Sequence, residues 1–227
     1  MTSASVLKDI NPVTGESTAI SPVVLELLAS RICHDLISPV GAINNGIEFL
    51  EDMGADAGEE AIKLIAHSAR QASVRLQAFR ICYGAGGRDG NIKPEDIKKA
   101  FEALTEADGK VAQSWDPHAD LGFSERPTGY CKILMGAMML GAECLPKGGI
   151  IKVKAGDGEE TVISAEGQDA IVRDGVEDAM AQTSDPSTLD PRLVHPFAIS
   201  ALAASYGLQI SIKEKEQGRV VISLKRG

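Results

Sequence analysis

The sequence contains few cysteines, and they are not spaced for a metal site or a disulfide framework. The four cysteines lie far apart, at positions 33, 82, 131 and 144, and no C-x-x-C pair is present. Structural zinc sites and disulfide-rich folds both depend on closely spaced cysteines, so neither is indicated. We therefore expect reduced thiols, as in cytosolic proteins, and no bound metal.

Long hydrophobic runs and an excess of positive charge are also missing. The longest apolar run, ILMGAMMLGA at 133–142, is much shorter than the roughly 20 residues that span a bilayer. The first residues show no basic stretch followed by an apolar core, so no signal peptide is expected. A net charge of −9 argues against general binding of nucleic acids or anionic membranes. These absences predict a cytoplasmic protein without nucleic-acid or membrane partners.

The chain does have enough apolar material for a core. Hydrophobic residues make up 44% of the 227 residues, and this length suggests one large or two small domains. Residues 1–20 are polar and irregular, and we interpret them as a flexible leader. Two parts are then predicted, a helical part at 21–86 and a mixed part at 92–227, on either side of the glycine-rich stretch GAGGRDGN.

The helical part has the pattern of an antiparallel hairpin. Ser21 and Pro22 suit the N-cap and the first position of a helix, which ends in the turn MGADAGE. A second helix begins near Glu59, and its apolar residues alternate at spacings of three and four, as in a coiled-coil seam. Those seam residues are Ile62, Ile65, Ala69, Ala72, Leu76, Phe79 and Tyr83.

One hairpin has too little interior for this much apolar surface. The first helix carries a main apolar seam and further apolar residues outside it. The latter are Val24, Leu27, Ile37, Val40 and Phe49. Two hairpins can enclose a core as a four-helix bundle, so we predict a homodimer through residues 21–83.

In the mixed part, the order of helix and strand patterns predicts an α/β sandwich. Helices are expected at 93–108, 128–146 and 190–207, and strands at 110–115, 148–155, 159–165 and within the hairpin 208–226. A G-D-G turn joins the second and third of these strands. The predicted fold class is therefore α+β, a helical hairpin followed by one sheet covered by helices.

A His-Asp pair lies in the middle of the first predicted helix, within RICHDLISPVG. At roughly 100° per residue, small and polar residues share the face of His34, away from the main apolar seam. The small and polar residues on that face are Ser30, Ser38, Gly41 and Asn45. We therefore expect His34 to be exposed to an approaching surface.

An exposed neutral imidazole can act as a nucleophile when its other ring nitrogen holds the proton. Two acceptors could select that tautomer, Asp35 next to the histidine and Ser38 one turn later. Pro39 has no N–H for the carbonyl of Asp35, and this local loosening could help to orient the aspartate.

A solvated polar helix face is the simplest alternative interpretation of the His-Asp pair. A metal site would need further ligands, and His67, His118 and His195 show no suitable local spacing. A serine hydrolase would need a G-x-S-x-G elbow, which the sequence lacks.

The motif HDLISP resembles the phosphoacceptor box of sensor histidine kinases. That box runs His, acidic residue, two variable residues, Ser/Thr/Asn and Pro, and His34, Asp35, Ser38 and Pro39 match it one by one. The wider stretch SRICHDLISPVGAINNGIEFLED is similar to the ChpT-type histidine phosphotransferases of alphaproteobacteria. This resemblance implies a dimeric hairpin followed by a kinase-like domain that has lost ATP binding.

The mixed part departs from the kinase pattern at the places that would contact ATP. Kinases hold Mg²⁺ and ATP with two Asn, four residues apart, before a P-x-G-G strand. Gly136 and Leu140 stand at those two places, and neither side chain offers an oxygen to a cation. Ala165 replaces the Asp that accepts from the adenine amino group, and RLVHPFAISA replaces the glycine-rich segment. The resemblance therefore implies a chain without a nucleotide cofactor.

The expected function is that of a phosphorelay histidine phosphotransferase. His34 would carry a phosphoryl group between receiver-domain aspartates of a hybrid kinase and a response regulator, with Asp35 and Ser38 supporting it. The expected docking residues are Ser30, Arg31, Gly41 and Asn45. Mg²⁺ is expected on the receiver and not on this chain. Two alternatives stay open, an ATP-dependent sensor histidine kinase and a non-catalytic dimeric adaptor of a two-component system.

Overall fold

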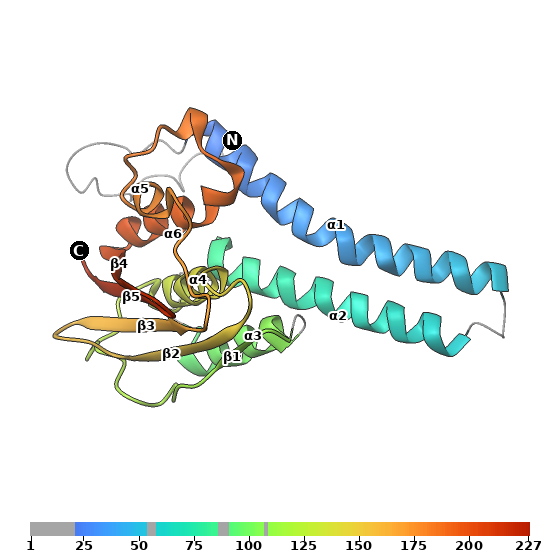
Figure 1. Cartoon of the computed structure of the whole chain (residues 1–227), viewed down its shortest axis with the longest axis horizontal. Helices are drawn as coiled ribbons and strands as arrows, with labels where there is room; N and C mark the ends of the chain where they lie inside the picture. Colours follow the sequence, from blue (N-terminus) through green and yellow to red (C-terminus); the bar gives the residue numbers. More distant parts are fainter. Residues whose placement is uncertain (1–20, 54–57, 86–90, 107–108) are drawn as a thin grey trace, which may run out of the picture.

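A helical hairpin projects from an α/β unit in this computed structural model, which describes residues 21–53, 58–85, 91–106 and 109–227 (Figure 1). Helix α1 runs over Pro22–Met53 and helix α2 over Gly58–Tyr83. Both helices therefore lie where the sequence predicts them. The predicted leader, residues 1–20, lies outside the described residues.

The two helices approach closely at Gly46. A Cβ atom added at Gly46 would lie 2.6 Å from Cγ1 of Ile65, a distance that side chains do not tolerate. Gly46 and Ala61 are both buried at this contact. Small residues thus bring α1 and α2 together along the part of the hairpin that projects beyond the α/β unit.

Only part of the apolar pattern of the hairpin is buried within the chain. Phe79 belongs to the main core, whereas Ile62 and Leu76 on α2 are exposed. The exposed large apolar residues of α1 beyond its first turn are Ile37, Val40, Ile47, Phe49 and Met53. This exposed apolar surface lies on the helices that the sequence predicts to dimerise.

The start of α1 corrects one expectation. The sequence pattern assigns Val24 and Leu27, which lie outside the main seam, to the contact with a partner hairpin. In the structure, Val24 is buried and Leu27 partly buried in a small cluster with residues 179–197 of the same chain. The second part of the chain therefore covers this end of α1.

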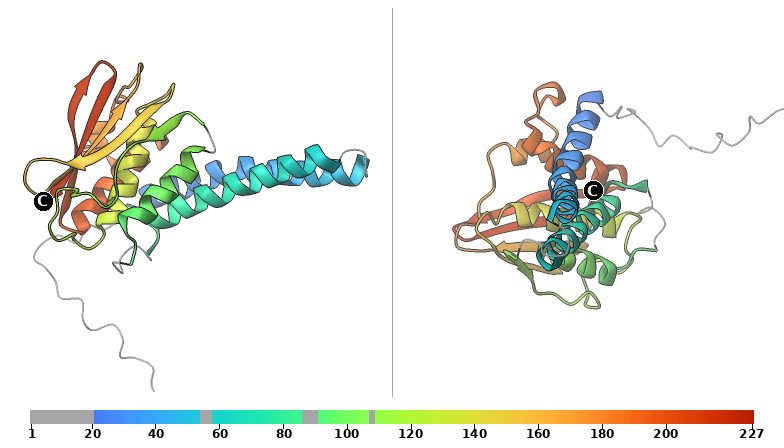
Figure 2. Two further views of the ribbon diagram at one scale, coloured as in Figure 1. Left: turned by 90° about the horizontal axis from the view of Figure 1, so that it is seen from below. Right: turned by 90° about the vertical axis from the view of Figure 1, so that its right-hand side faces the viewer.

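The second part folds into one five-stranded sheet with helices packed on it (Figure 2). Its helices are α3 (Pro94–Glu106), α4 (Tyr130–Glu143), α5 (Val176–Met180) and α6 (Val194–Ser205). Its strands are β1 (Val111–Gln113), β2 (Gly149–Ala155), β3 (Glu160–Glu166), β4 (Leu208–Glu216) and β5 (Arg219–Arg226). The strand order is β1-β2-β3-β5-β4, with β1 parallel to β2 and the other neighbours antiparallel.

The fold class predicted from the sequence, a helical hairpin followed by an α/β sandwich, is confirmed. Two details differ: α5 was not predicted, and the helix predicted at 190–207 begins as the 3-10 turn η4 (Pro191–Leu193) before α6. The Asp190 carboxylate accepts from the backbone N–H of Arg192 at 2.8 Å, which holds this turn outside the α-helix.

The hairpin is packed against the α/β unit over a broad contact. Ala78, Phe79, Ile81 and Cys82 near the end of α2 belong to the same core cluster as α4 and the sheet. Buried Lys132 of α4 donates from Nζ to the Cys82 carbonyl at 3.4 Å and to that of Gly84, two acceptors at the end of α2. The orientation of the hairpin on the second part is therefore set by apolar packing and by polar contacts.

Candidate functional site

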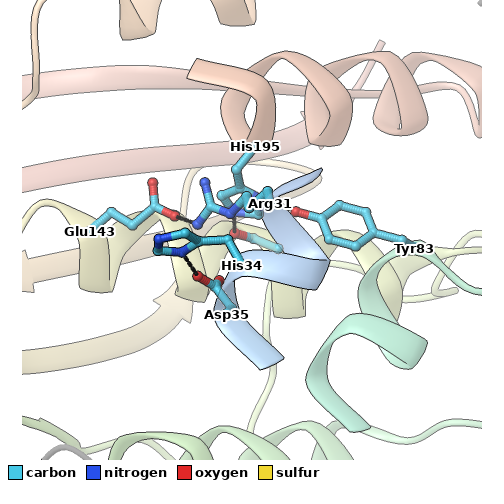
Figure 3. A network of polar contacts seen from close by, with 7 residues as sticks. Arg31, His34, Asp35, Tyr83, Glu143 and His195 are labelled. Atoms are coloured by element: carbon cyan, nitrogen blue, oxygen red, sulfur yellow. Dashed lines mark hydrogen bonds and ion pairs between the residues drawn. The ribbon is translucent and has the colours of Figure 1, made fainter. Parts of the chain in front are cut away.

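His34 stands on the open side of α1 with its ring beside Asp35 (Figure 3). The His34 side chain is 89% exposed and that of Asp35 is 36% exposed. Nδ1 of His34 lies 3.4 Å from Oδ1 of Asp35, a long contact of the kind that shortens when a substrate binds. Because a carboxylate only accepts, this geometry favours the proton on Nδ1 and leaves the lone pair of Nε2 for attack.

The other candidate acceptor, Ser38, does not contact the histidine. Ser38 is exposed one turn later on α1, and within the described residues no hydrogen bond joins it to His34. Of the two acceptors that the sequence left open, the structure thus places the carboxylate against the ring.

The small and polar face predicted around His34 is open. Ser30 and Asn45 are exposed, and a Cβ atom added at Gly41 would meet no heavy atom within 4 Å. Nothing in the described part of the chain therefore crowds this side of α1. A second protein has room to approach His34 along the helix.

A cleft of about 670 Å³ separates this part of α1 from the second part of the chain, and we call it the His34 cleft. Its walls are Ser30, Arg31, His34 and Asp35 of α1 and, opposite them, Ala142, Glu143, Pro146, Arg173, Pro191 and Arg192. Arg173 and Arg192 are exposed, and neither has an ion-pair partner among the described residues. The wall that faces His34 therefore presents two free positive charges.

No pattern in the sequence marks Arg173 and Arg192. Arg173 lies just before α5 and Arg192 within η4, both in the connection between β3 and α6 and far along the chain from the His-Asp pair. No local spacing marks them, since their relation to His34 exists only through the packing of α1 against that connection.

Arg31 links the two walls of the cleft. Its Nη2 donates to the Glu143 carboxylate at the end of α4, and its side chain is 21% exposed. Although burial disfavours the charged form, the Glu143 carboxylate raises the pKa of the Arg31 guanidinium above its ordinary value. The sequence placed Arg31 on the docking face, and the structure shows that it also ties α1 to the second part.

A second polar link lies beneath this pair. His195 of α6 is fully buried, and its Nε2 lies 3.0 Å from the Gly136 carbonyl oxygen. A carbonyl only accepts, so Nε2 carries the proton and Nδ1 accepts from the Tyr83 hydroxyl of α2. Burial lowers the pKa of His195, so the ring is neutral and holds α2, α4 and α6 together.

The three positions where kinases would contact ATP lie inside the core. Gly136, Leu140 and Ala165 are all buried. A Cβ atom at Gly136 would lie 2.2 Å from Cδ1 of Ile199, which is itself fully buried on α6. The chain's own α6 thus packs against the α4 position where a kinase would have its first Asn.

The described residues contain no group of three or more His, Cys, Asp or Glu side chains arranged to hold a metal ion. Within the same ranges, no helix combines the length and the apolar character needed to cross a membrane.

Comparison with known proteins gives the family. Residues 94–218 match the family described as "Histidine phosphotransferase C-terminal domain". Over 192 residues, 82% of this chain and 88% of the relative, the sequence is 38% identical to "Protein phosphotransferase ChpT" of Brucella abortus (strain 2308).

The chain belongs to the histidine phosphotransferase family.

A solved structure agrees with this assignment. A bacterial phosphotransferase solved at 1.7 Å is 32% identical, with a TM-score of 0.73 over 94% of this chain and 99% of the other. The histidine kinase AdeS of Acinetobacter baumannii is 12% identical over 86% of this chain, with a TM-score of 0.47. The family match, the Brucella relative and the bacterial phosphotransferase structure confirm, at the level of the family, the resemblance stated from HDLISP and its surroundings. In this member of the family, His34 is the one histidine on the long first helix, and its side chain is exposed.

Proposed function

We propose that this phosphotransferase carries a phosphoryl group between receiver-domain aspartates through His34, from a hybrid kinase to a response regulator. The observation that carries the proposal is the exposed imidazole whose Nδ1 faces Asp35, which leaves the lone pair of Nε2 available. The small, open face of α1 supports it, because a receiver must bring its aspartate against the ring.

The transfer is a displacement at phosphorus in each direction. The Nε2 lone pair of His34 forms the new P–N bond while the P–O bond to the receiver aspartate breaks, and the aspartate leaves as a carboxylate with the bonding electrons. The Nδ1 proton stays on the ring, and the Asp35 carboxylate stabilises the positive charge that develops there. Mg²⁺ would be supplied by the receiver, so the phosphotransferase needs only an aligned nucleophile and a docking surface.

The chain divides this work between two units. We propose that residues 21–86 form the dimerisation and phosphotransfer unit and that residues 92–227 form a kinase-like domain without a nucleotide site. Buried Gly136, Leu140 and Ala165 support the second assignment. Exposed apolar residues on both hairpin helices support a homodimer, and the docking face would comprise Ser30, Arg31, Gly41 and Asn45 with part of the second unit.

A transfer assay with an isotopically labelled phospho-receiver tests His34 directly. His34→Ala should fold and dimerise normally, because an exposed side chain contributes little packing, yet it should take up no label. Asp35→Asn should retain part of the activity, since it keeps an acceptor but loses the negative charge beside the ring.

His118→Ala is the matched control. His118 is also exposed and also pairs with a carboxylate, with Nδ1 3.1 Å from Oε1 of Glu95. It lies in a turn and does not line the His34 cleft, so its loss should leave transfer unchanged. Label retained by the His34→Ala protein, or phosphate located on another residue by mass spectrometry, would refute the proposal.

A further inference from the structure

Helix α1 lacks one of its own hydrogen bonds beside the proposed nucleophile. Pro39 lies inside α1 and is buried. It has no N–H for the carbonyl of Asp35, and its ring pushes against that carbonyl. The carbonyl of the peptide that follows Asp35 therefore has no partner from the helix backbone, although Asp35 is the residue that must face the His34 ring.

Arg75 of α2 supplies the missing donor. Its Nη1 donates to the Asp35 carbonyl oxygen at 3.0 Å, across the hairpin. Both residues line a cavity of about 360 Å³ between the hairpin and the second part, whose wall includes Phe79, Leu104 and Met139. A hydrogen bond to a charged donor in such partly apolar surroundings holds its acceptor more firmly than one in open water.

We propose that Arg75 is a positioning residue for phosphotransfer: it fixes the backbone of Asp35, so that the carboxylate faces Nδ1 of His34. The inference rests on the function proposed for His34 and adds to it a residue outside the family motif. Without the Arg75 contact, the Asp35 carbonyl has no donor and the peptide can tilt more, so the carboxylate loses its alignment with the ring. The guanidinium itself does not touch the phosphoryl group.

A small phosphoryl donor separates this role from receiver docking. With phosphoramidate, His34 Nε2 displaces ammonia at phosphorus, so labelling depends on the ring and its orientation and not on a protein partner. Arg75→Met should label about tenfold more slowly, since it keeps the aliphatic stem but removes the donors. Arg75→Lys should stay within about threefold of wild type, because an ammonium group can donate to the same carbonyl. Arg70→Met, an exposed arginine on the same helix, is the control and should be unchanged.

Pro39→Ala provides the second arm of a double-mutant cycle. This substitution restores a backbone N–H that can bond the Asp35 carbonyl within the helix. In the Pro39→Ala background, Arg75→Met should therefore slow labelling by phosphoramidate by less than about threefold. A loss of equal size in both backgrounds would show that Arg75 acts as a direct cation and would overturn the inference.

The tautomer of the His34 ring gives a second readout of the role of Arg75, and it does not depend on a labelling rate. Nitrogen NMR of the imidazole should show the proton mainly on Nδ1 in the wild type and a shift toward the Nε2-protonated form in Arg75→Met. Pro39→Ala combined with Arg75→Met should return toward the wild-type ratio, even if that chain labels slowly.

The two proposals fail in different ways. If phosphoramidate labels the wild type but not at His34, the proposed function is wrong. If His34 is labelled equally fast in the wild type and in Arg75→Met, or if the tautomer ratio does not change, only the role of Arg75 is wrong.

Discussion

The four histidines of this chain show how environment separates residues of one type. On α2, Nε2 of His67 lies 2.8 Å from Nε2 of Gln71. His118 lies in a turn and pairs with Glu95. His195 is fully buried between Tyr83 and Gly136. Of the four, His34 alone lines the cleft beside the open face of α1. An acidic neighbour alone is therefore not enough to select His34 as the candidate nucleophile, because His118 has one too.

His195 predicts how stability depends on pH. Its pKa in the folded chain is lowered, chiefly by burial, so below pH 6.5 the unfolded chain binds a proton that the folded chain does not. The contribution of His195 is fully present above pH 6.5 and is lost as the pH falls below it. The free energy of unfolding should then decrease by up to about 1.4 kcal/mol per pH unit.

Denaturant unfolding at several pH values measures this dependence. His195→Gln retains polar atoms but cannot take up a proton, so its unfolding free energy should be lower overall and flatter between pH 5 and 7 than that of the wild type. An equally steep decrease in both proteins would assign the dependence to other groups.

At the scale of elements, the packing of the hairpin on the second part leaves some of its apolar residues exposed to a partner and buries others. Leu76 is 55% exposed on α2, whereas Phe79, three residues later, is buried in the chain's own core. The sequence alone predicts that a charge at either position disturbs the dimer. The structure separates the two positions, because an aspartate at 79 would lie inside the monomer and would unfold it.

Leu76→Asp should therefore give a folded monomer. The charge would be desolvated without a partner in the predicted four-helix bundle but would be solvated in the separate chain. Light scattering should show half the wild-type mass, with the helical circular dichroism signal retained. Gln77→Asp, at an exposed neighbouring position, should remain dimeric. A wild-type monomer would contradict the predicted bundle.

At the scale of the whole molecule, the packing of the two units creates the His34 cleft. The cluster around Val24, the Arg31–Glu143 pair and the Tyr83–His195 contact hold α1 and α2 on the second part. The wall opposite His34 then carries Arg173 and Arg192, while the molecule as a whole has a net charge of −9. A local positive surface thus faces the site where a phosphoryl group of nearly two negative charges would arrive.

Reversing these two charges should weaken the approach of a phospho-receiver. A chain with Arg173→Glu and Arg192→Glu should accept phosphoryl groups from a receiver at least about tenfold more slowly, through a higher KM and slower association. The control pair is Lys154→Glu and Lys225→Glu, which make the same change of charge at exposed positions on strands β2 and β5. Equal rates in wild type and the arginine variant would remove these residues from the docking surface.

The second unit should not bind ATP. The side chains at Gly136, Leu140 and Ala165 provide no oxygen for Mg²⁺ or for the adenine amino group, and Ile199 occupies the space beside Gly136. Calorimetric titration with ATP and Mg²⁺ should give no saturable heat. A micromolar dissociation constant would favour an active kinase instead.

Local patterns in the sequence are enough to place the elements and to select His34 as the candidate nucleophile. These patterns are the three-and-four spacing of apolar residues, the capping residues, the glycines between elements and the HDLISP motif within one helix. Such signals involve residues a few positions apart, where chain geometry alone decides which side chains share a face.

Contacts between distant residues, in contrast, follow from the way the elements pack. Glu143 pairs with Arg31, Arg75 binds the carbonyl of Asp35, and Arg192 faces His34, although each pair is far apart in the chain. The covering of Val24 by the second part belongs to the same class. One sequence carries no local sign of such contacts, because they depend on how the helices pack once their apolar faces are buried together.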